Sequence, residues 1–298
     1  MRKLPVRALK QIAAAIGMTV SAAVGAAAGD ADISLVAAEN FYGDVARQIG
    51  GNRLAVLSIL SNPNQDPHLF ETTPGVVRKV ADARIVIVNG ANYDPWMQKL
   101  ISAAPRPGRT VITVTALVGK KSGDNPHVWY DPPTIPAVAK ALAAALGKMD
   151  PERQPEYEMR LQAFLASLSP LEQKILEMRA KYAGTPITAT EPVFAYMANA
   201  IGLTIRNERF QVAVMNDTEP AARDLAAFEN DLNKRNVKVL LYNKQVTSNL
   251  ASRLIDVARG ANVPVVGITE TEPADTGFLD WMLGELDQLE GALRGPPR

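Results

Sequence analysis

Short apolar runs alternate with segments whose apolar residues recur at helical spacing along most of the chain. The apolar runs predict buried strands, and the segments between them predict amphipathic helices. Strands are predicted at 33–38, 54–60, 84–90, 186–190, 237–243 and 263–269, and helices at 41–50, 74–83, 134–147, 192–202, 219–236, 248–262 and 276–293. This alternation is typical of parallel α/β sheets.

One long stretch in the middle of the chain follows a different pattern. Its apolar residues succeed one another at steps of three and four, which predicts a helix with one apolar face. They are Tyr157, Leu161, Phe164, Leu168, Leu171, Ile175, Met178 and Tyr182. Ser169, Pro170 and Glu172 suit the start of a second helix, so one helix and two helices in line are both compatible with the pattern. A coiled-coil seam competes with both, but the stretch is short for one.

We therefore predict an α/β fold with two lobes, each a parallel sheet flanked by helices, joined by a long linking helix. The predicted boundaries are an N-terminal lobe at 29–150, the linking helix at 151–182 and a C-terminal lobe at 183–298.

Residues 1–28 have the layout of a secretory signal peptide. A basic head precedes an apolar stretch over 12–24 and small residues up to Ala28, near which we expect cleavage. A membrane anchor is the alternative, but the apolar stretch is short and interrupted by polar residues and Gly17. The sequence contains no Cys for lipid attachment, and no later stretch is apolar enough to span a bilayer. We expect a periplasmic protein.

Composition narrows the classes of function. The 298 residues are 47% hydrophobic and 21% charged, which suits a globular protein with a sizeable core. The net charge of +1 belongs to the signal segment, because 28 basic and 31 acidic residues remain without it. Nothing in that balance favours a nucleic-acid partner. The absence of Cys excludes disulfides and thiolate metal sites, and the usual dinucleotide, nucleotide and serine-hydrolase motifs are missing.

The chain has only two histidines, and both lie in turns punctuated by proline. His68 is part of DPHLFETTP and His127 is part of NPHVWYDP. Neutral imidazole binds divalent metals such as zinc, manganese and iron, and prolines would hold each ring in a fixed direction. A single His is more often a hydrogen-bonding residue than a ligand, so at this point the pair is only a candidate metal site.

These motifs, with the long helix and TEPVFAYMANAIGL, resemble the periplasmic metal-binding receptors of bacterial ABC importers. The resemblance extends over essentially the whole chain after the signal segment. The family motif D-P-H-x-x-E-x-T-P is matched around His68, whereas Asn125 replaces the Asp of D-P-H-x-W before His127. The resemblance implies two lobes joined by a rigid helix, one divalent metal ion held between them as the transported ligand, and a membrane permease as partner.

The resemblance also implies a set of four metal ligands, which are His68, His127, Glu191 and Asp275. Glu191 precedes Phe194 and Tyr196 at the family's intervals, at a position that is His or Glu. Asp275 matches more loosely an acidic residue ahead of the last helix, with Glu272 and Asp280 as further candidates. The alternatives are that Glu191 is a helix-start carboxylate and that Asp275 caps the last helix. No role is assigned to the segment 242–245.

We therefore expect a monomeric, non-enzymatic receptor for one divalent transition metal. Two carboxylates beside two imidazoles favour manganese or iron, and zinc is the alternative because it stands above manganese in the general affinity order. A metal-dependent hydrolase using the same residues would need an open position for water. A surface adhesion protein of the same fold would need an outward binding face.

Overall fold

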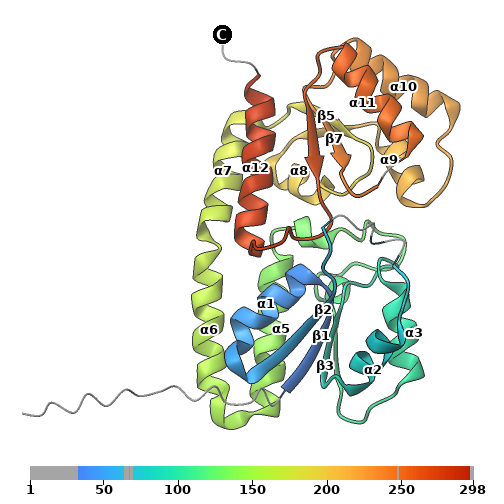
Figure 1. Cartoon of the computed structure of the whole chain (residues 1–298). Helices are drawn as coiled ribbons and strands as arrows, with labels where there is room; N and C mark the ends of the chain where they lie inside the picture. Colours follow the sequence, from blue (N-terminus) through green and yellow to red (C-terminus); the bar gives the residue numbers. More distant parts are fainter. Residues whose placement is uncertain (1–32, 64–66, 68–69, 247, 296–298) are drawn as a thin grey trace, which may run out of the picture.

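The computed structural model describes residues 33–63, 67, 70–246 and 248–295, which form two α/β lobes stacked end to end (Figure 1). The predicted signal segment and His68 lie outside the described residues. None of the helices in the described part of the chain is long and apolar enough to span a bilayer.

The first lobe is built on a parallel sheet with strand order β2-β1-β3-β4. Its main elements are β1 (Ile33–Glu39), α1 (Asn40–Gly50), β2 (Leu54–Leu60), α2 (Pro74–Asp82), β3 (Ile85–Val88), α3 (Pro95–Ala103), β4 (Thr110–Thr113) and α5 (Thr134–Met149). Successive residues of β1 point to opposite faces, as the period of a strand requires. Leu35 and Ala37 pack with α1 and α5, whereas Val36 and Ala38 pack with α2 and α3. Helices therefore cover both faces of the sheet.

The second lobe repeats the topology with strand order β6-β5-β7-β8. Its elements are β5 (Pro186–Ala189), α8 (Ala195–Ile201), β6 (Thr204–Arg206), α9 (Glu208–Met215), α10 (Ala222–Asn233), β7 (Leu240–Asn243), α11 (Asn249–Gly260), β8 (Val265–Ile268) and α12 (Phe278–Arg294). In both sheets the first strand is central, and the third strand joins it on the side opposite the second. Such a switch in strand order opens a crevice at the carboxyl ends of the strands, where ligands of α/β proteins bind.

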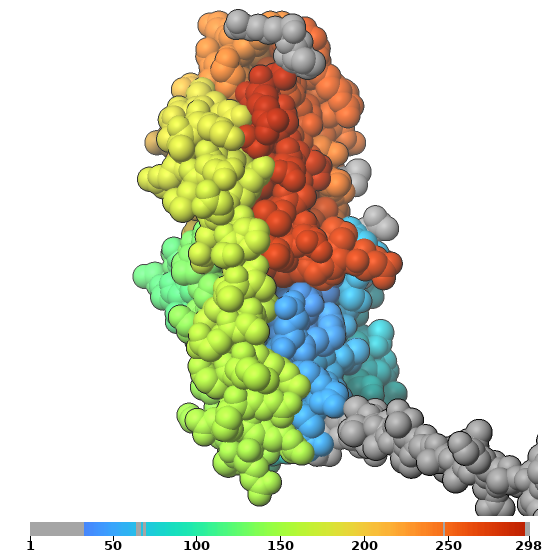
Figure 2. Space-filling view, turned by 90° about the vertical axis from the view of Figure 1, so that its left-hand side faces the viewer, coloured from blue at the N-terminus to red at the C-terminus, as the bar shows by residue number. Residues whose placement is uncertain are grey.

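Two helices in line, α6 (Gln154–Ser167) and α7 (Ser169–Tyr182), connect the lobes. The predicted apolar stripe is buried from Tyr157 to Met178. Leu168 separates the helices, and Pro170 in the first turn of α7 has no N–H to continue the hydrogen-bond ladder. Figure 2 shows the pair running along both lobes, with α12 beside α7 and above α1. Helix α12 therefore provides a second contact between the lobes, in addition to the connection through α6 and α7.

The predicted fold class is confirmed, although some elements were not predicted from the sequence. These are β4, β6, α3, α9 and the short helix α4 (Val114–Leu117). The two strands are short edge strands with partly exposed residues, so they lack the apolar run that marks the central strands. The helix predicted from residue 192 begins only at Ala195.

Candidate metal centre between the lobes

Three polar side chains of the second lobe lie where its strands end. Asn243 is the last residue of β7, and Glu191 and Glu270 each follow a strand end by two residues, after β5 and β8. The carboxyl ends of parallel strands share one edge of the sheet, so these side chains converge. All are buried, with Glu191 8% and Glu270 0% exposed.

His127 of the first lobe meets this edge. Its ring is 1% exposed, and its Nε2 lies 3.3 Å from Oε2 of Glu270. Asn125 Oδ1 lies 2.6 Å from Nδ1 on the other side of the ring, and it also accepts a hydrogen bond from the His127 backbone N–H. Trp129 and Tyr93 pack against the ring, with centroids 5.2 and 5.9 Å away. His127 is therefore shielded from solvent and held with Nε2 towards a carboxylate of the opposite lobe.

Asn243 joins the two carboxylates of the second lobe. Its Nδ2 donates to Glu191 Oε2 at 3.2 Å and also donates to Glu270 Oε1. Gln245 holds the backbone on the same side, because its Oε1 accepts from the N–H groups of Glu270 and Thr271. The sequence offered no role for this segment, yet its two amide side chains fix the acidic groups of the site.

The surroundings of the site are rich in buried acids. Burial, aided by the nearby Asp94, raises the pKa of Glu39 well above its usual value, and neither Glu39 oxygen has a hydrogen-bond partner among the described residues. Burial also raises the pKa of Asp94 to about 6. Burial, followed by the charges of Glu270 and Glu39, raises the pKa of Tyr93 well above its usual value. Burial thus favours the neutral forms of these acids, and a cation nearby would favour their negatively charged forms instead.

The structure brings only some of the predicted metal ligands close to one another. Among the described residues, no three His, Cys, Asp or Glu side chains lie together as a metal-binding group. His127 and Glu270 are in direct contact, and Glu191 reaches Glu270 through Asn243. Glu191 lies ahead of Phe194, the residue that caps α8, and is therefore not the first-turn carboxylate of that helix.

Asp275 is not brought to this group. It is exposed and adopts a φ of 59° in the turn before α12. It does not cap the helix either, because Gly277 is the N-cap and Asp44 of the first lobe accepts the hydrogen bond from the Phe278 N–H.

The two further candidates also lie apart from the His127–Glu270 contact. Asp280 is exposed on the first turn of α12. Glu272 is buried, and its backbone N–H and carbonyl bind the side chain of Asn40 across the lobe boundary. Burial, with the charge of Asp44, raises the pKa of Glu272 to about 8.

Glu270 is therefore the acidic group that the sequence reasoning missed. It stands directly after the predicted strand 263–269. The strand-end position was the available signal, because ligands of parallel sheets gather there. Asp275 was predicted instead because the resemblance implies an acidic residue just before the last helix.

The strand end that carries Glu270 is braced from both lobes. Glu285 of α12 accepts hydrogen bonds from the Thr269 N–H at 2.9 Å and from Trp281 Nε1 at 3.1 Å. The Tyr130 hydroxyl of the first lobe lies 2.6 Å from the Thr269 carbonyl and 2.5 Å from Glu285 Oε2, so its one hydrogen serves two acceptors. Burial raises the pKa of Glu285 to about 7 although these donors oppose the shift.

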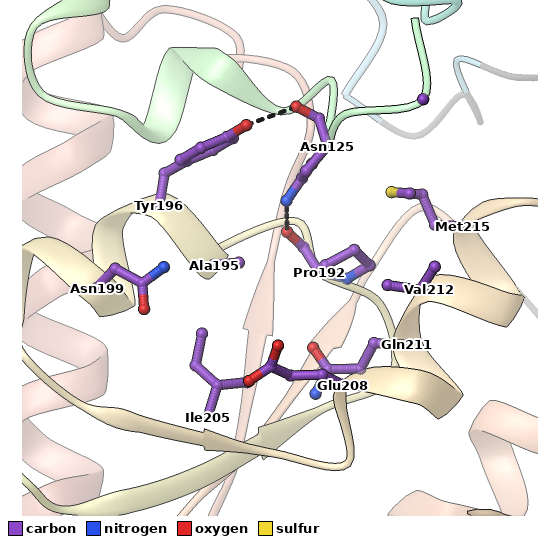
Figure 3. Close-up of a pocket in the computed structure, with 11 residues that line it drawn as sticks. Asn125, Pro192, Ala195, Tyr196, Asn199, Ile205, Glu208, Gln211, Val212 and Met215 are labelled. Atoms are coloured by element: carbon purple, nitrogen blue, oxygen red, sulfur yellow. Dashed lines mark hydrogen bonds between the residues drawn. The ribbon is translucent and has the colours of Figure 1, made fainter. Parts of the chain in front are cut away.

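A pocket of about 260 Å³ lies beside the site, where the lobes meet. Asn125 of the first lobe forms one wall, and Pro192, Tyr196 and Met215 of the second lobe face it (Figure 3). Asn125 thus belongs both to this pocket and to the His127 contact.

Comparisons with known proteins agree with this architecture. Residues 35–292 match the model of the family ZnuA, described as zinc-uptake complex component A, periplasmic. The manganese ABC transporter substrate-binding lipoprotein PsaA of Streptococcus mitis is 27% identical over 195 residues, which are 59% of this chain and 62% of that protein. The high-affinity zinc uptake system protein ZnuA of Bacillus subtilis (strain 168) is 23% identical over 262 residues, 80% of each chain. The matched region spans about three fifths of the length of several streptococcal relatives, PsaA of Streptococcus mitis among them, and 91% of the length of the lipoprotein SloC of Streptococcus mutans.

Solved structures show the same fold. The periplasmic zinc binding protein TroA from Treponema pallidum superposes with a TM-score of 0.75 at 20% identity, covering 88% of this chain and 99% of that one. A manganese-bound periplasmic metal binding protein from Candidatus Liberibacter asiaticus, an S38A mutant, gives 0.72 at 17% identity with the same coverage. At these identities the likeness concerns the fold.

Proposed function

The chain belongs to the ZnuA family of periplasmic zinc-uptake components, and on that premise we propose that it is a receptor for one divalent transition-metal ion. The ion would lie between the lobes, bound by His127, Glu191 and Glu270 together with His68. The contact of His127 with Glu270 across the lobe boundary carries this proposal.

The chemistry of these groups supports a cation. Imidazole and carboxylate are the ligands that transition metals share, and both must be deprotonated to bind. In the structure the Glu270 carboxylate and His127 Nε2 already face each other at 3.3 Å. A metal ion would bind both atoms, and it would offset the charge of the buried acids nearby.

We propose manganese or iron as the ion, with zinc as the alternative. Carboxylate oxygens bind singly or through both atoms, which suits five or six contacts better than a compact tetrahedral site. The names of the relatives include manganese, zinc and iron, and the preference therefore rests on the donor set alone.

The proposed receptor acts as a monomer in the periplasm and delivers its ion to the membrane permease of an ABC importer. Residues 1–28 would direct its export. It would bind no nucleic acid and catalyse no reaction. The buried environment of His127 and Glu270 argues against a hydrolase, because a catalytic metal keeps a position open for water and substrate.

Titration of the purified, chelator-treated protein tests the proposal. Manganese, ferrous iron and zinc are added separately in a calorimeter, and melting is followed with and without each metal. We expect one ion per chain and a higher melting temperature, because a ligand that binds only the folded state stabilises it. Absence of both heat and a melting shift with all three metals would refute the receptor function.

A further inference from the structure

We infer that Asn125 is a positioning residue that fixes His127 in one tautomer and ties it to the loop of Glu191 across the lobe boundary. The inference rests on the proposed function, because its consequence is a slower release of the bound ion. No ligand role is assigned to Asn125 itself.

The side-chain amide of Asn125 forms hydrogen bonds through both its nitrogen and its oxygen. Its Nδ2 donates to the Pro192 carbonyl at 2.7 Å, which fixes the amide with oxygen towards His127 (Figure 3). The oxygen accepts from the His127 backbone N–H at 3.0 Å and lies 2.6 Å from Nδ1. An amide oxygen only accepts, so Nδ1 carries hydrogen and Nε2 is left to face Glu270.

The partner carbonyl stands next to a proposed ligand. Pro192 directly follows Glu191, so the Asn125 hydrogen bond fixes the backbone that carries this carboxylate. One side chain therefore orients a ligand of the first lobe and holds the loop of a ligand of the second. Partners of this kind, one step removed from a metal, typically alter its affinity by about 10- to 100-fold.

Tyr196 of α8 adds a second tie to the same residue. Its hydroxyl donates to the Asn125 backbone carbonyl at 2.8 Å, as Figure 3 shows. Burial, followed by the charges of Asp131 and Asp124, raises the pKa of Tyr196 to about 12, so the hydroxyl keeps its proton and remains a donor. The loop before His127 is thus bound to the second lobe through both side chain and backbone.

Only an amide can make these contacts at position 125. An Asp, which the resembled family has here, would keep the acceptor for Nδ1 but would place an oxygen against the Pro192 carbonyl. An Ala would lose both contacts. Compared with the Asp of the resembled family, Asn125 therefore lacks a negative charge beside the imidazole but forms a neutral hydrogen bond between the lobes.

This bond has a kinetic consequence. Separation of the lobes to release the ion must break the hydrogen bond from Asn125 to Pro192. When separated lobes capture an ion, this hydrogen bond has not yet formed. Asn125 should therefore slow dissociation and leave association nearly unchanged.

Stopped-flow transfer of manganese or zinc from the loaded protein to a chelator measures the release rate, and mixing of metal with the metal-free protein measures association. We expect Asn125→Asp to release the ion about tenfold faster, because it loses one buried hydrogen bond and gains a repulsion between oxygens. Association should stay within about twofold of wild type. Asn125→Ala should release faster still. Tyr196→Phe, which removes only the backbone tie, should fall between wild type and Asn125→Asp.

Asn199→Asp is the matched control, because Asn199 lines the same pocket and the change adds the same charge. We expect it to release the ion at the wild-type rate. Wild-type release by both Asn125→Asp and Tyr196→Phe would overturn the tie between the lobes. Equal acceleration by Asn199→Asp would attribute the effect to charge and would also overturn it. A wild-type protein that binds none of the metals would instead refute the proposed function.

Imidazole ¹⁵N spectra test the orientation of His127 separately. The chain has two histidines, so a His68→Gln variant assigns the signals. We expect hydrogen on Nδ1 of His127 in the wild type and in Asn125→Asp, and a mixture of tautomers in Asn125→Ala. Hydrogen on Nε2 in the metal-free wild type, or identical spectra for Asn125→Ala, would overturn the positioning role.

Discussion

The two lobes bring their candidate ligands to the site by different means. In the first lobe, β4 ends at Thr113 and His127 follows only after thirteen residues, 114–126, which form the short helix α4 (Val114–Leu117) and then a loop. In the second lobe, Glu191 and Glu270 stand two residues beyond the ends of β5 and β8. The candidate ligand in the loop is held by neighbouring prolines and Asn125, whereas the candidate ligands at the strand ends take their positions from the sheet.

This difference decides how visible each ligand is in the sequence. A loop residue that must be held rigidly is surrounded by the residues that hold it, and the result is a motif such as NPHVWYDP. A residue at a strand end needs no such local pattern, because its backbone is already fixed by the ladder, and Glu270 has none, although Glu191 is followed at the family's intervals by Phe194 and Tyr196. Its signal is its distance from the end of the strand.

Removal of the loop ligand should have the largest effect on binding. We expect His127→Ala to weaken metal binding by more than about a hundredfold, since even residues one step removed from a metal cost 10- to 100-fold. Calorimetry with manganese and zinc measures the loss, and melting of the metal-free variant controls for folding. Binding within about threefold of wild type would show that the loop histidine is not a ligand.

Glu285, which braces the strand end before Glu270, should make the stability of the protein depend on pH. The folded-state pKa of Glu285 is raised to about 7, so the folded protein holds a proton that the unfolded chain releases near pH 4.5. Its contribution to stability is therefore full below that value and is lost as pH rises towards 7, by up to about 3 kcal/mol. Glu285→Gln should remove this share of the decline and leave the shares of Glu39, Asp94 and Glu272.

Urea unfolding of the chelator-treated protein at pH 5 and pH 8 measures the effect of Glu285→Gln. Asp280→Asn, which alters an exposed carboxylate on the same helix, is the control and should keep the wild-type difference between the two pH values. Equal pH dependence in Glu285→Gln and wild type would mean that Glu285 is ionised in the folded protein throughout this range.

A smaller effect is expected from exchanging a strand-end carboxylate for the type of ligand used by the first lobe. Glu191→His should raise the affinity for zinc relative to manganese by about tenfold, because imidazole favours compact nitrogen sites. Glu191→Gln should weaken both metals, and manganese more. Competition between the metals in one buffer measures the ratio, and an unchanged ratio in Glu191→His would remove Glu191 from the ligand set.

Much of the fold could be predicted because its central strands and helices carry clear patterns of apolar residues that are buried. The runs at 33–38 and 54–60 correspond to β1 and β2, and the stripe from Tyr157 to Met178 corresponds to α6 and α7. The edge strands β4 and β6 escaped prediction because they are short and partly exposed, so no apolar run marks them.

The site was predictable only where local sequence fixes a side chain. His127 is marked by its prolines and aromatic neighbours, and the structure surrounds it with Tyr93 and Trp129. Glu270 and Asn243 become neighbours only through the order of strands in the second sheet, which no short stretch of sequence specifies. The prediction of Asp275 relied on nearness to α12, and the turn before that helix carries Asp275 to the surface instead.

A matched pair of neutral variants tests the central claim most directly, namely that a strand-end carboxylate meets His127 across the lobe boundary. Glu270→Gln and Asp275→Asn each remove one negative charge, and they lie five residues apart on the same connection. In calorimetric titration with manganese and zinc, we expect Glu270→Gln to lose more than about a hundredfold in affinity. Asp275→Asn should bind as wild type does. Loss of binding in Asp275→Asn with full binding in Glu270→Gln would contradict the account.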